Sequence, residues 1–218
     1  MPTSPGAAEL TTPFSKAIRA ATDAAHADAE QAPFLAALLD ASLGRDRLAR
    51  LAVQHLHIYR DLEAAADSLA GDPVAGPFVA EELRRVPALE ADLAALLGTG
   101  WEDHLEPLPA TAAYCARLRE VGASWPAGFV AHHYTRYLGD LSGGIFIGRK
   151  LEEILDIQEH RGTSFYVFPD IPSPAAFKDR YRALLDQAPW DDAERARVID
   201  EILLAYAHNT AVLEELGR

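Results

Sequence analysis

The segment Arg136-Tyr-Leu-Gly-Asp-Leu-Ser-Gly-Gly144 is the most informative part of this sequence. Apolar residues continue a helical pattern on both sides of it, yet it carries three glycines in six residues. Glycine inside a helix costs roughly 1 kcal/mol relative to alanine. Gly139 and Gly143 are four residues apart, so they lie on one helix face and leave it without side chains. Such a face suits close packing of another helix, but the adjacent Asp140 and the rest of the chain favour the close approach of a flat ligand.

Composition and charge narrow the classes of protein to which the chain can belong. Its 218 residues, 49% of them hydrophobic, suffice for one domain with a sizeable core. No apolar run approaches the roughly 20 residues that cross a bilayer, so we expect no membrane association. The net charge of −13 argues against nucleic acid as a partner, because phosphate binding needs clustered Lys and Arg. Residues 1–11 lack the pattern of a secretory signal, and we expect them to be a disordered lead to a cytoplasmic domain over residues 12–218.

Helical periodicity dominates the chain, and alternation of β-branched residues is scarce. Apolar stripes that end at prolines and glycines predict helices over residues 13–32, 34–41, 46–68, 77–98, 110–121, 127–155, 174–185 and 192–216. Residues 161–174 are expected to form a loop with an aromatic cluster of Phe165, Tyr166 and Phe168. The sequence therefore predicts an all-α, single-domain protein of about seven or eight helices.

Eight histidines invite a search for a metal site, but most of their spacings do not suit one. The chain lacks Glu-x-x-His, His-Glu-x-x-His and Cys-x-x-Cys-His, which are the patterns of di-iron bundles, zinc hydrolases and covalently attached heme. The histidines that we expect to be packing, supporting or surface residues are His55, His57, His104, His132, His133, His160 and His208. The single Cys115 excludes an internal disulfide and is expected to be a buried thiol.

His26 differs from the other histidines, because Glu30 follows it one turn later on the same helix face. A carboxylate that accepts a hydrogen bond from Nδ1–H fixes the tautomer of an imidazole and leaves Nε2 to bind a metal. Ordinary surface pairs share this spacing, so the pair alone does not distinguish a metal ligand from a surface histidine.

Several motifs, in the same order along the chain, resemble the biliverdin-producing heme oxygenases over almost the whole sequence. One of them runs from Ala131-His132 through Gly144, and its part from Tyr134 to Gly144 is the most specific. The others are Ala25-His-Ala-Asp-Ala-Glu30, His57-Ile-Tyr59 with Leu62-Glu63, Phe165-Tyr-Val-Phe-Pro169, Phe177-Lys-Asp-Arg-Tyr-Arg182, and Asn209 with Glu214-Glu-Leu216.

This resemblance implies a heme between a proximal helix and a kinked distal helix. His26 would be the proximal iron ligand and Glu30 its hydrogen-bonding partner. Gly139 and Gly143 would let the distal backbone lie over the iron, and Asp140 would organise distal water. The resemblance also implies a distal polar network of Tyr59, Arg136 and Asn209, and contacts to the heme propionates from Lys178 and Arg182, with Tyr134, Arg19 and Lys16 nearby.

The residue types suit this chemistry. A neutral imidazole, unlike a thiolate, gives little push toward O–O cleavage, and the oxygen must instead attack a meso carbon of the heme itself. Asp140 can hold a water that relays protons. Lys178 and Arg182 lie one turn apart and supply cations for two propionates on an acidic protein. Without the resemblance, that pair would be interpreted as a solvated helix face.

Three features depart from the family pattern. Asp23 stands where relatives often carry a basic residue near the propionates. Ile145 replaces a common glutamine beside the distal kink, and the sequence stops at Arg218 without the hydrophobic tail of the membrane-anchored animal enzymes. In this last respect it resembles the soluble bacterial enzymes.

We therefore expect a heme oxygenase that cleaves heme to biliverdin, ferrous iron and carbon monoxide, with heme as both substrate and cofactor. It would use O2 and electrons from an external donor such as a ferredoxin, a flavodoxin or a reductase, since no G-x-G-x-x-G follows a strand. The main alternative is a heme carrier or sensor on the same fold, which loss of Asp140 or of a distal glycine would favour. A thiaminase-like enzyme would need a nucleophilic cysteine, and Cys115 has no activating basic neighbour.

Overall fold

The computed structural model describes residues 12–30, 33–40 and 44–218, except for the side chain of Glu30. The expected disordered lead, residues 1–11, lies outside this part of the chain. The all-α class is confirmed, since these residues form helices and turns but no strand, and none of their helices is long and apolar enough to cross a membrane. The α-helices are α1 (Phe14–Glu30), α2 (Pro33–Leu39), α3 (Arg45–Leu69), α4 (Val86–Leu97), α5 (Pro109–Ser124), α6 (Pro126–Gly139), α7 (Ile145–Leu155), α8 (Pro174–Gln187) and α9 (Asp192–Leu216). Shorter elements include the 3₁₀ turns η2 (Glu81–Leu83) and η5 (Ser164–Tyr166) and the π turn η4 (Asp140–Gly144).

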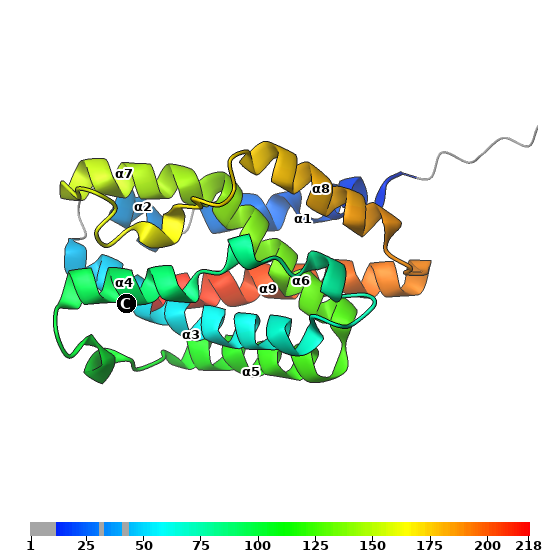
Figure 1. Cartoon of the computed structure of the whole chain (residues 1–218), viewed down its shortest axis with the longest axis horizontal. Coiled ribbons are helices and arrows are strands. Elements are labelled where there is room, and N and C mark those ends of the chain that lie inside the picture. The colour runs from blue at the N-terminus through cyan, green and yellow to red at the C-terminus, as the bar shows by residue number, and fades with distance from the viewer. Residues whose placement is uncertain (1–11, 31–32, 41–43) are drawn as a thin grey trace, which may run out of the picture.

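Helix α9 is the central element of the fold. It packs against α1, α2, α5 and α6, while α3 packs against α4 and α5. Figure 1 shows α3 and α5 on one side of α9 and α1, α2, α7 and α8 on the other, with α6 crossing obliquely between the two groups and α4 overlapping α9 in this view. The buried hydrophobic side chains of these helices form one continuous cluster. The described helices therefore share one core, as the sequence predicts.

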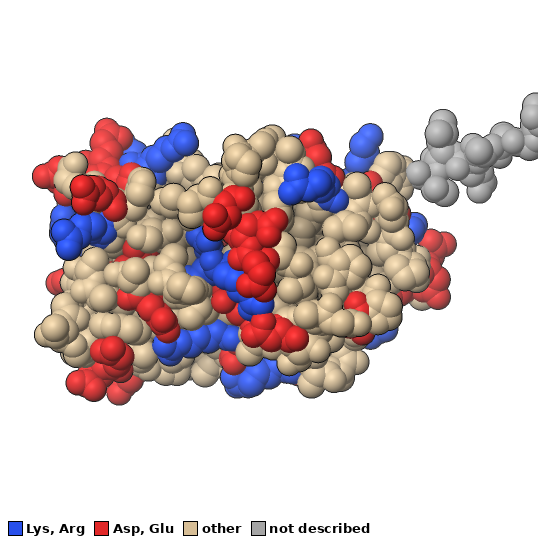
Figure 2. Space-filling view, in the orientation of Figure 1, with Lys and Arg blue, Asp and Glu red and all other residues tan. Residues whose placement is uncertain are grey.

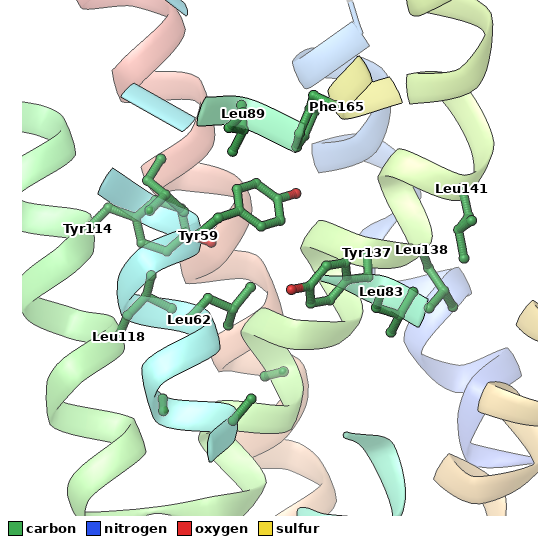
Figure 3. Close-up of a cluster of buried hydrophobic side chains, with 14 of the residues drawn as sticks. Tyr59, Leu62, Leu83, Leu89, Tyr114, Leu118, Tyr137, Leu138, Leu141 and Phe165 are labelled. Atoms are coloured by element: carbon green, nitrogen blue, oxygen red, sulfur yellow. The ribbon is translucent and has the colours of Figure 1, made fainter. Parts of the chain in front are cut away.

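Part of this core lies between α3 and α6. Figure 3 shows Tyr59 of α3 and Tyr137 of α6 among leucines of the same cluster, and their ring centroids are 5.5 Å apart. Both tyrosines are buried, so their hydroxyl groups need hydrogen-bond partners. The hydroxyl of Tyr137 lies 3.5 Å from Oε1 of Glu63, whereas that of Tyr59 points to the site described below.

Two of the expected helices differ from the structure. The pattern predicts a helix from Pro77, but α4 begins only at Val86, after two 3₁₀ turns. Pro87 explains the difference, because proline lacks an N–H, disfavours the α conformation in the residue before it and fits best in the first turn of a helix. The helix expected from 127 to 155 is interrupted by η4. Largely for this reason the described residues form nine α-helices rather than seven or eight.

The start of α1 is held by a side chain from α8. Asp186 accepts a hydrogen bond from the backbone N–H of Ser15 at 2.7 Å and one from its hydroxyl at 3.1 Å. N–H groups in the first turn of a helix have no partner within the helix, so Asp186 acts as a cap. The local sequence suggests Thr12 for this role and cannot reveal a partner from a distant helix. This contact fixes α1 against α8, and both helices contribute to the site.

A buried ion pair ties α5, α6 and α9 together. Arg117 donates to both carboxylate oxygens of Glu201, at 2.8 and 2.6 Å, and Nε2 of His132 lies 2.7 Å from Oε1 of the same group. Burial alone would raise the pKa of Glu201, but the hydrogen bonds from His132 and Arg117 outweigh it and lower this pKa to about 2. Burial lowers the pKa of His132, so this imidazole is neutral at pH 7.

Replacing Glu201 with Gln should lower the free energy of unfolding by about 2–3 kcal/mol at neutral pH, because Arg117 and His132 lose their charged partner. A carboxyl whose pKa is depressed in the folded state stabilises the fold above its unfolded pKa, and this contribution is lost as the pH falls toward the folded value. The difference between wild type and Glu201→Gln should therefore be smaller at pH 3 than at pH 7. Urea denaturation at both pH values measures it, and an equal difference at the two would contradict the assignment.

Candidate functional site

The helix α6 continues into α7 through the π turn η4. The N–H of Ile145 donates to the carbonyl of Asp140, five residues earlier, instead of the usual four. Such a turn accommodates one extra residue and bends the helix axis, and π turns inside α-helices occur frequently at functional sites. The kinked distal helix implied by the resemblance thus takes the form of a π turn that contains Asp140, Gly143 and Gly144.

Gly139, just before the kink, and Gly143, within it, leave an open helix face. Gly139 and Gly143 are exposed, and a Cβ atom placed on either would meet no described heavy atom within 4 Å. Gly148, further along α7, behaves in the opposite way, because its Cβ would lie 2.4 Å from Cβ of Tyr166. Close packing against another helix therefore explains Gly148 but not Gly139 and Gly143. Their bare face is available to a ligand.

Four residues of the expected distal network lie together behind this face. Tyr59 donates a hydrogen bond from its hydroxyl to Oδ2 of Asp140, and Nε of Arg136 donates to the Tyr59 oxygen at 3.2 Å. The guanidinium of Arg136 also lies over the Tyr59 ring, 4.8 Å from its centroid. Nη1 of Arg136 donates to Oδ1 of Asn209 at 2.7 Å. Helices α3, α6 and α9 thus converge on the carboxylate of Asp140.

The environment of Asp140 favours its protonated form. Burial raises the pKa of this carboxyl, while the charge of Arg136, the hydrogen bond from Tyr59 and the charge of Arg85 oppose the shift without cancelling it. Burial also raises the pKa of Tyr59 well above its ordinary value, so the phenol stays protonated and donates. Asp140 is therefore a carboxyl group that holds a proton more readily than an aspartate in water.

Sequence reasoning missed Arg85 as part of this environment. Its guanidinium is buried, donates to the carbonyl of Leu83 at 3.1 Å and lies 4.1 Å from the centroid of the Phe168 ring. In the sequence it follows another arginine and precedes Val86-Pro87, a context that looks like an ordinary charged turn. Its contacts with Phe165, Val167 and Phe168 join residues 80 or more positions apart, which no local pattern shows.

Helix α9 connects His26 with the distal network. His26 is exposed on α1, and its ring contacts the ring of Tyr206 edge-on, with centroids 6.1 Å apart. Tyr206 lies three residues before Asn209, the partner of Arg136, so both project from one face of α9. One face of α9 therefore contacts both expected walls of the site. The bond between Glu30 and His26 stays a prediction, because the Glu30 side chain is outside the described residues.

Cations from α8 and α1 lie at the edge of the open face. Nζ of Lys178 donates to the hydroxyl of Ser142, within the π turn, at 2.8 Å. Burial and the neighbouring charge of Arg182 lower the pKa of Lys178. Burial raises the pKa of Tyr134 on α6, and the charges of Arg182 and Arg19 oppose this shift, which places both arginines near the phenol. The expected propionate contacts from α8, α1 and α6 thus gather in one region.

The structure gives fewer contacts for Lys16, Asp23 and Ile145, the other positions singled out in the sequence near this region. Lys16 is exposed on α1, one turn before Arg19, and Asp23 is exposed one turn after it. Asp23 therefore adds a negative charge to the helix that also carries the two cations. Ile145, the second departure from the family pattern, is half-buried and packs against the core beside the kink.

The other histidines have structural partners or lie on the surface. Nδ1 of His133 lies 2.8 Å from the hydroxyl of Tyr181, and Nε2 of His57 lies 3.2 Å from the carbonyl of Leu105. In the described ranges, no group of three or more His, Cys, Asp or Glu side chains could hold a metal ion. Cys115 is buried, and burial raises its pKa to about 12, so it carries no thiolate for a thiaminase-like reaction.

The contrast between the glycines predicts opposite effects of one substitution on the ligand-free protein. Gly139→Ala should raise the free energy of unfolding by up to about 1 kcal/mol, because alanine is the better helix former and its Cβ enters open space. Gly148→Ala should lower it by roughly 1–3 kcal/mol, because its Cβ overlaps Tyr166. Urea denaturation of both variants tests the prediction, and a strongly destabilised Gly139→Ala would show that its face is packed.

Several known proteins are similar to this chain in sequence and in fold. The family model described as heme oxygenase matches residues 12–215. Heme oxygenase 1 of Homo sapiens is 38% identical over 205 residues, which are 93% of this chain and 71% of that protein. Heme oxygenase 1 of Nostoc sp. is 33% identical over 199 residues, which are 91% of this chain and 84% of that protein. The crystal structure of heme oxygenase-1 from the cyanobacterium Synechocystis sp. in complex with heme superposes with a TM-score of 0.89 at 32% identity, covering 94% of this chain and 92% of that one. The chain belongs to the heme oxygenase family.

Proposed function

We propose that this protein is a heme oxygenase that binds heme between His26 of α1 and the bare face of Gly139 and Gly143. It cleaves heme to biliverdin, ferrous iron and carbon monoxide with O2 and external electrons. The observation that carries the proposal is this open glycine face, which no described side chain fills and which lies directly beside the hydrogen-bonded Asp140. The related Synechocystis protein was solved in complex with heme, which supports the same ligand here.

The residues present suit a heme. Bound heme supplies the redox-active iron at which oxygen is activated and the macrocycle that is itself cleaved. The exposed imidazole of His26 is the type of ligand that heme iron accepts from α-helices, and a single such ligand suffices, unlike in a multidentate metal site. The backbone of Gly139 and Gly143 can approach a flat macrocycle closely because no Cβ intervenes.

Asp140 delivers protons in this proposal. The Tyr59 hydroxyl occupies Oδ2, so Oδ1 is the oxygen that can hold an ordered water toward the open face. Burial raises the pKa of Asp140, so this carboxyl gives and takes a proton at higher pH than an aspartate in water does. Arg136 and Asn209 fix the Tyr59–Asp140 pair through α6 and α9. In this proposal, these residues therefore determine the position from which a proton is delivered at the open face.

The cations at the edge of the face orient the substrate. Arg182 and Arg19 lie near the phenol of Tyr134, and Lys178, on the same helix as Arg182, donates to Ser142. Lys16 adds a further positive charge on α1. On a chain with a net charge of −13, these groups supply the local positive potential that two carboxylates need. Figure 2 shows that elsewhere on the displayed face acidic and basic side chains are interspersed.

Electrons come from a separate protein in this proposal. The sequence contains no dinucleotide-binding G-x-G-x-x-G, so a ferredoxin, a flavodoxin or a reductase must supply them. We place the reaction in the cytoplasm, where such donors occur.

A single reaction tests the proposed function. Hemin is added to the protein, followed by a reductant under air, and the visible spectrum is recorded. Loss of the Soret band together with the appearance of biliverdin and carbon monoxide is expected. A heme complex that persists under these conditions would instead indicate a carrier.

Asp140→Ala should separate heme binding from heme cleavage. Heme affinity should stay close to that of the wild type, because the carboxylate is not an iron ligand. Biliverdin formation should fall about a hundredfold or more, since the loss removes a positioned proton donor. Asp103→Ala, at an exposed aspartate of another turn, is the control. Biliverdin formed by Asp140→Ala at the wild-type rate would rule out the proton-transfer role.

Changing Lys178 and Arg182 together to Gln should alter the product more than the affinity. Burial of the macrocycle provides most of the binding, and each exposed ion pair contributes about 1 kcal/mol or less. Rotation of heme within its plane changes which meso carbon is attacked, so a mixture of biliverdin isomers is expected on chromatography. Arg180→Gln, at an exposed position of the same helix, should leave the isomer unchanged. A single unchanged isomer from the double variant would assign the orientation to Arg19 and Lys16.

A further inference from the structure

The 3₁₀ turn η5 is held at both of its ends by buried charges. Asp92 of α4 accepts hydrogen bonds from the backbone N–H groups of Ser164 at 2.7 Å and Phe165 at 2.8 Å. Arg85 donates from Nη1 to the carbonyl oxygens of Val167 and, at 3.4 Å, Phe165. Asp92 is 2% exposed and Arg85 5%. Two buried side chains of ionisable residues thus bind the backbone of one short turn.

Burying two charged side chains beside a loop is energetically unfavourable. Removing a carboxylate and a guanidinium from water costs several kcal/mol each, which only well-oriented hydrogen bonds offset. In the described part of the chain, Asp92 and Arg85 form no ion pair with each other, and the four hydrogen bonds through which they hold η5 go to its backbone and to that of Val167. The position of η5 is therefore fixed more strictly than a connecting loop requires.

The side chains of η5 pack against two elements of the distal site. The Phe165 ring contacts the Tyr59 ring edge-on, with centroids 5.2 Å apart and an angle of 73° between the ring planes. Tyr166 packs against Gly148 of α7, where a Cβ would lie 2.4 Å from Cβ of the tyrosine. Figure 3 shows Phe165 at the edge of the cluster that contains Tyr59. The turn is thus wedged between α3, which carries the donor to Asp140, and the helix that follows the kink.

We propose that Arg85 and Asp92 are positioning residues for proton transfer: they lock η5, whose Phe165 holds the Tyr59 hydroxyl on Asp140. Neither residue touches the open face itself. Arg85 acts in addition through its charge. This inference rests on the proposed role of Asp140 as the proton donor.

The electrostatic part of the proposal has a defined sign. Burial raises the pKa of Asp140, and the positive charge of Arg85 is one of three influences that hold the shift back. Loss of that charge, or displacement of the Tyr59 hydroxyl, should therefore raise this pKa further. The titratable or charged groups around Asp140 that belong to the packed elements are Arg136 and Tyr137 of α6, Tyr59 of α3, Arg85 before α4, Tyr114 of α5 and Tyr166 of η5.

The test follows the carboxyl of Asp140 directly in the heme-free protein. Protein labelled with ¹³C at aspartate carboxyl groups is titrated by NMR, and Asp140→Asn identifies the resonance. The variants are Arg85→Met, which removes charge and donors, Arg85→Lys, which keeps the charge alone, and Phe165→Leu, which keeps the turn but removes the ring. Arg84→Gln is the control, since the half-buried Arg84 pairs with the exposed carboxylates of Asp67 and Glu81 and is not among the charges that act on Asp140. Thermal unfolding shows that each variant is folded.

We expect the titration of Asp140 to move to higher pH in Arg85→Met, to move less in Arg85→Lys and Phe165→Leu, and to stay unchanged in Arg84→Gln. The pH profile of biliverdin formation should shift in the same order. Its maximum should fall roughly ten- to a hundredfold in Arg85→Met, because misplacement of a catalytic group by about 1 Å costs up to about a hundredfold. An unchanged Asp140 titration in folded Arg85→Met and Phe165→Leu would overturn the inference. If wild type forms no biliverdin, the proposed function fails, yet the NMR titration still decides whether η5 positions Asp140.

Discussion

The hydrogen bond from Tyr59 to Asp140 connects the packed interior of this protein with its open face. Tyr59 is a residue of α3 in the hydrophobic core, whereas Asp140 is the first residue of the π turn. Gly139 and Gly143, close to Asp140 in the sequence, leave the helix face there without side chains. A helix segment rich in glycine is poorly stabilised by its own propensity. It must therefore be held from behind, and Arg136 completes that support by binding Tyr59 and the α9 residue Asn209. The site can stay bare on one side because the hydrogen bonds among Tyr59, Asp140, Arg136 and Asn209 hold it from the other.

Opposing electrostatic effects give this carboxyl its chemical character. Burial favours the neutral acid, and the positive charges of Arg136 and Arg85 favour the ionised form. The balance leaves the pKa of Asp140 above its ordinary value. Removing either arginine would raise the pKa of Asp140 further and so favour the neutral acid. The chain is strongly acidic overall, so these local cations, rather than net charge, set the potential at the site.

Much of the fold follows from the sequence, and the exceptions have physical causes. The limits of α9 agree with the apolar periodicity over Asp192–Leu216, and the glycine motif indicated an open helix face. Local patterns did not reveal the π turn, because a single π turn adds only one residue to a helix and leaves the apolar spacing helical on both sides of it. They also misplaced the start of α4, where Pro87 outweighs the apolar stripe. Contacts such as Asp186 on α1 and Arg85 on η5 join residues far apart in sequence, so only the folded chain shows them.

The central claim is that heme lies between His26 and the glycine face of the kinked helix. A crystal structure of the protein after addition of hemin tests it most directly. The iron should be bonded to Nε2 of His26, and the opposite side of the macrocycle should contact the backbone of Gly139 and Gly143, with its propionates near Lys178 and Arg182. Iron bonded to another side chain, or a heme bound away from the two glycines, would contradict the account.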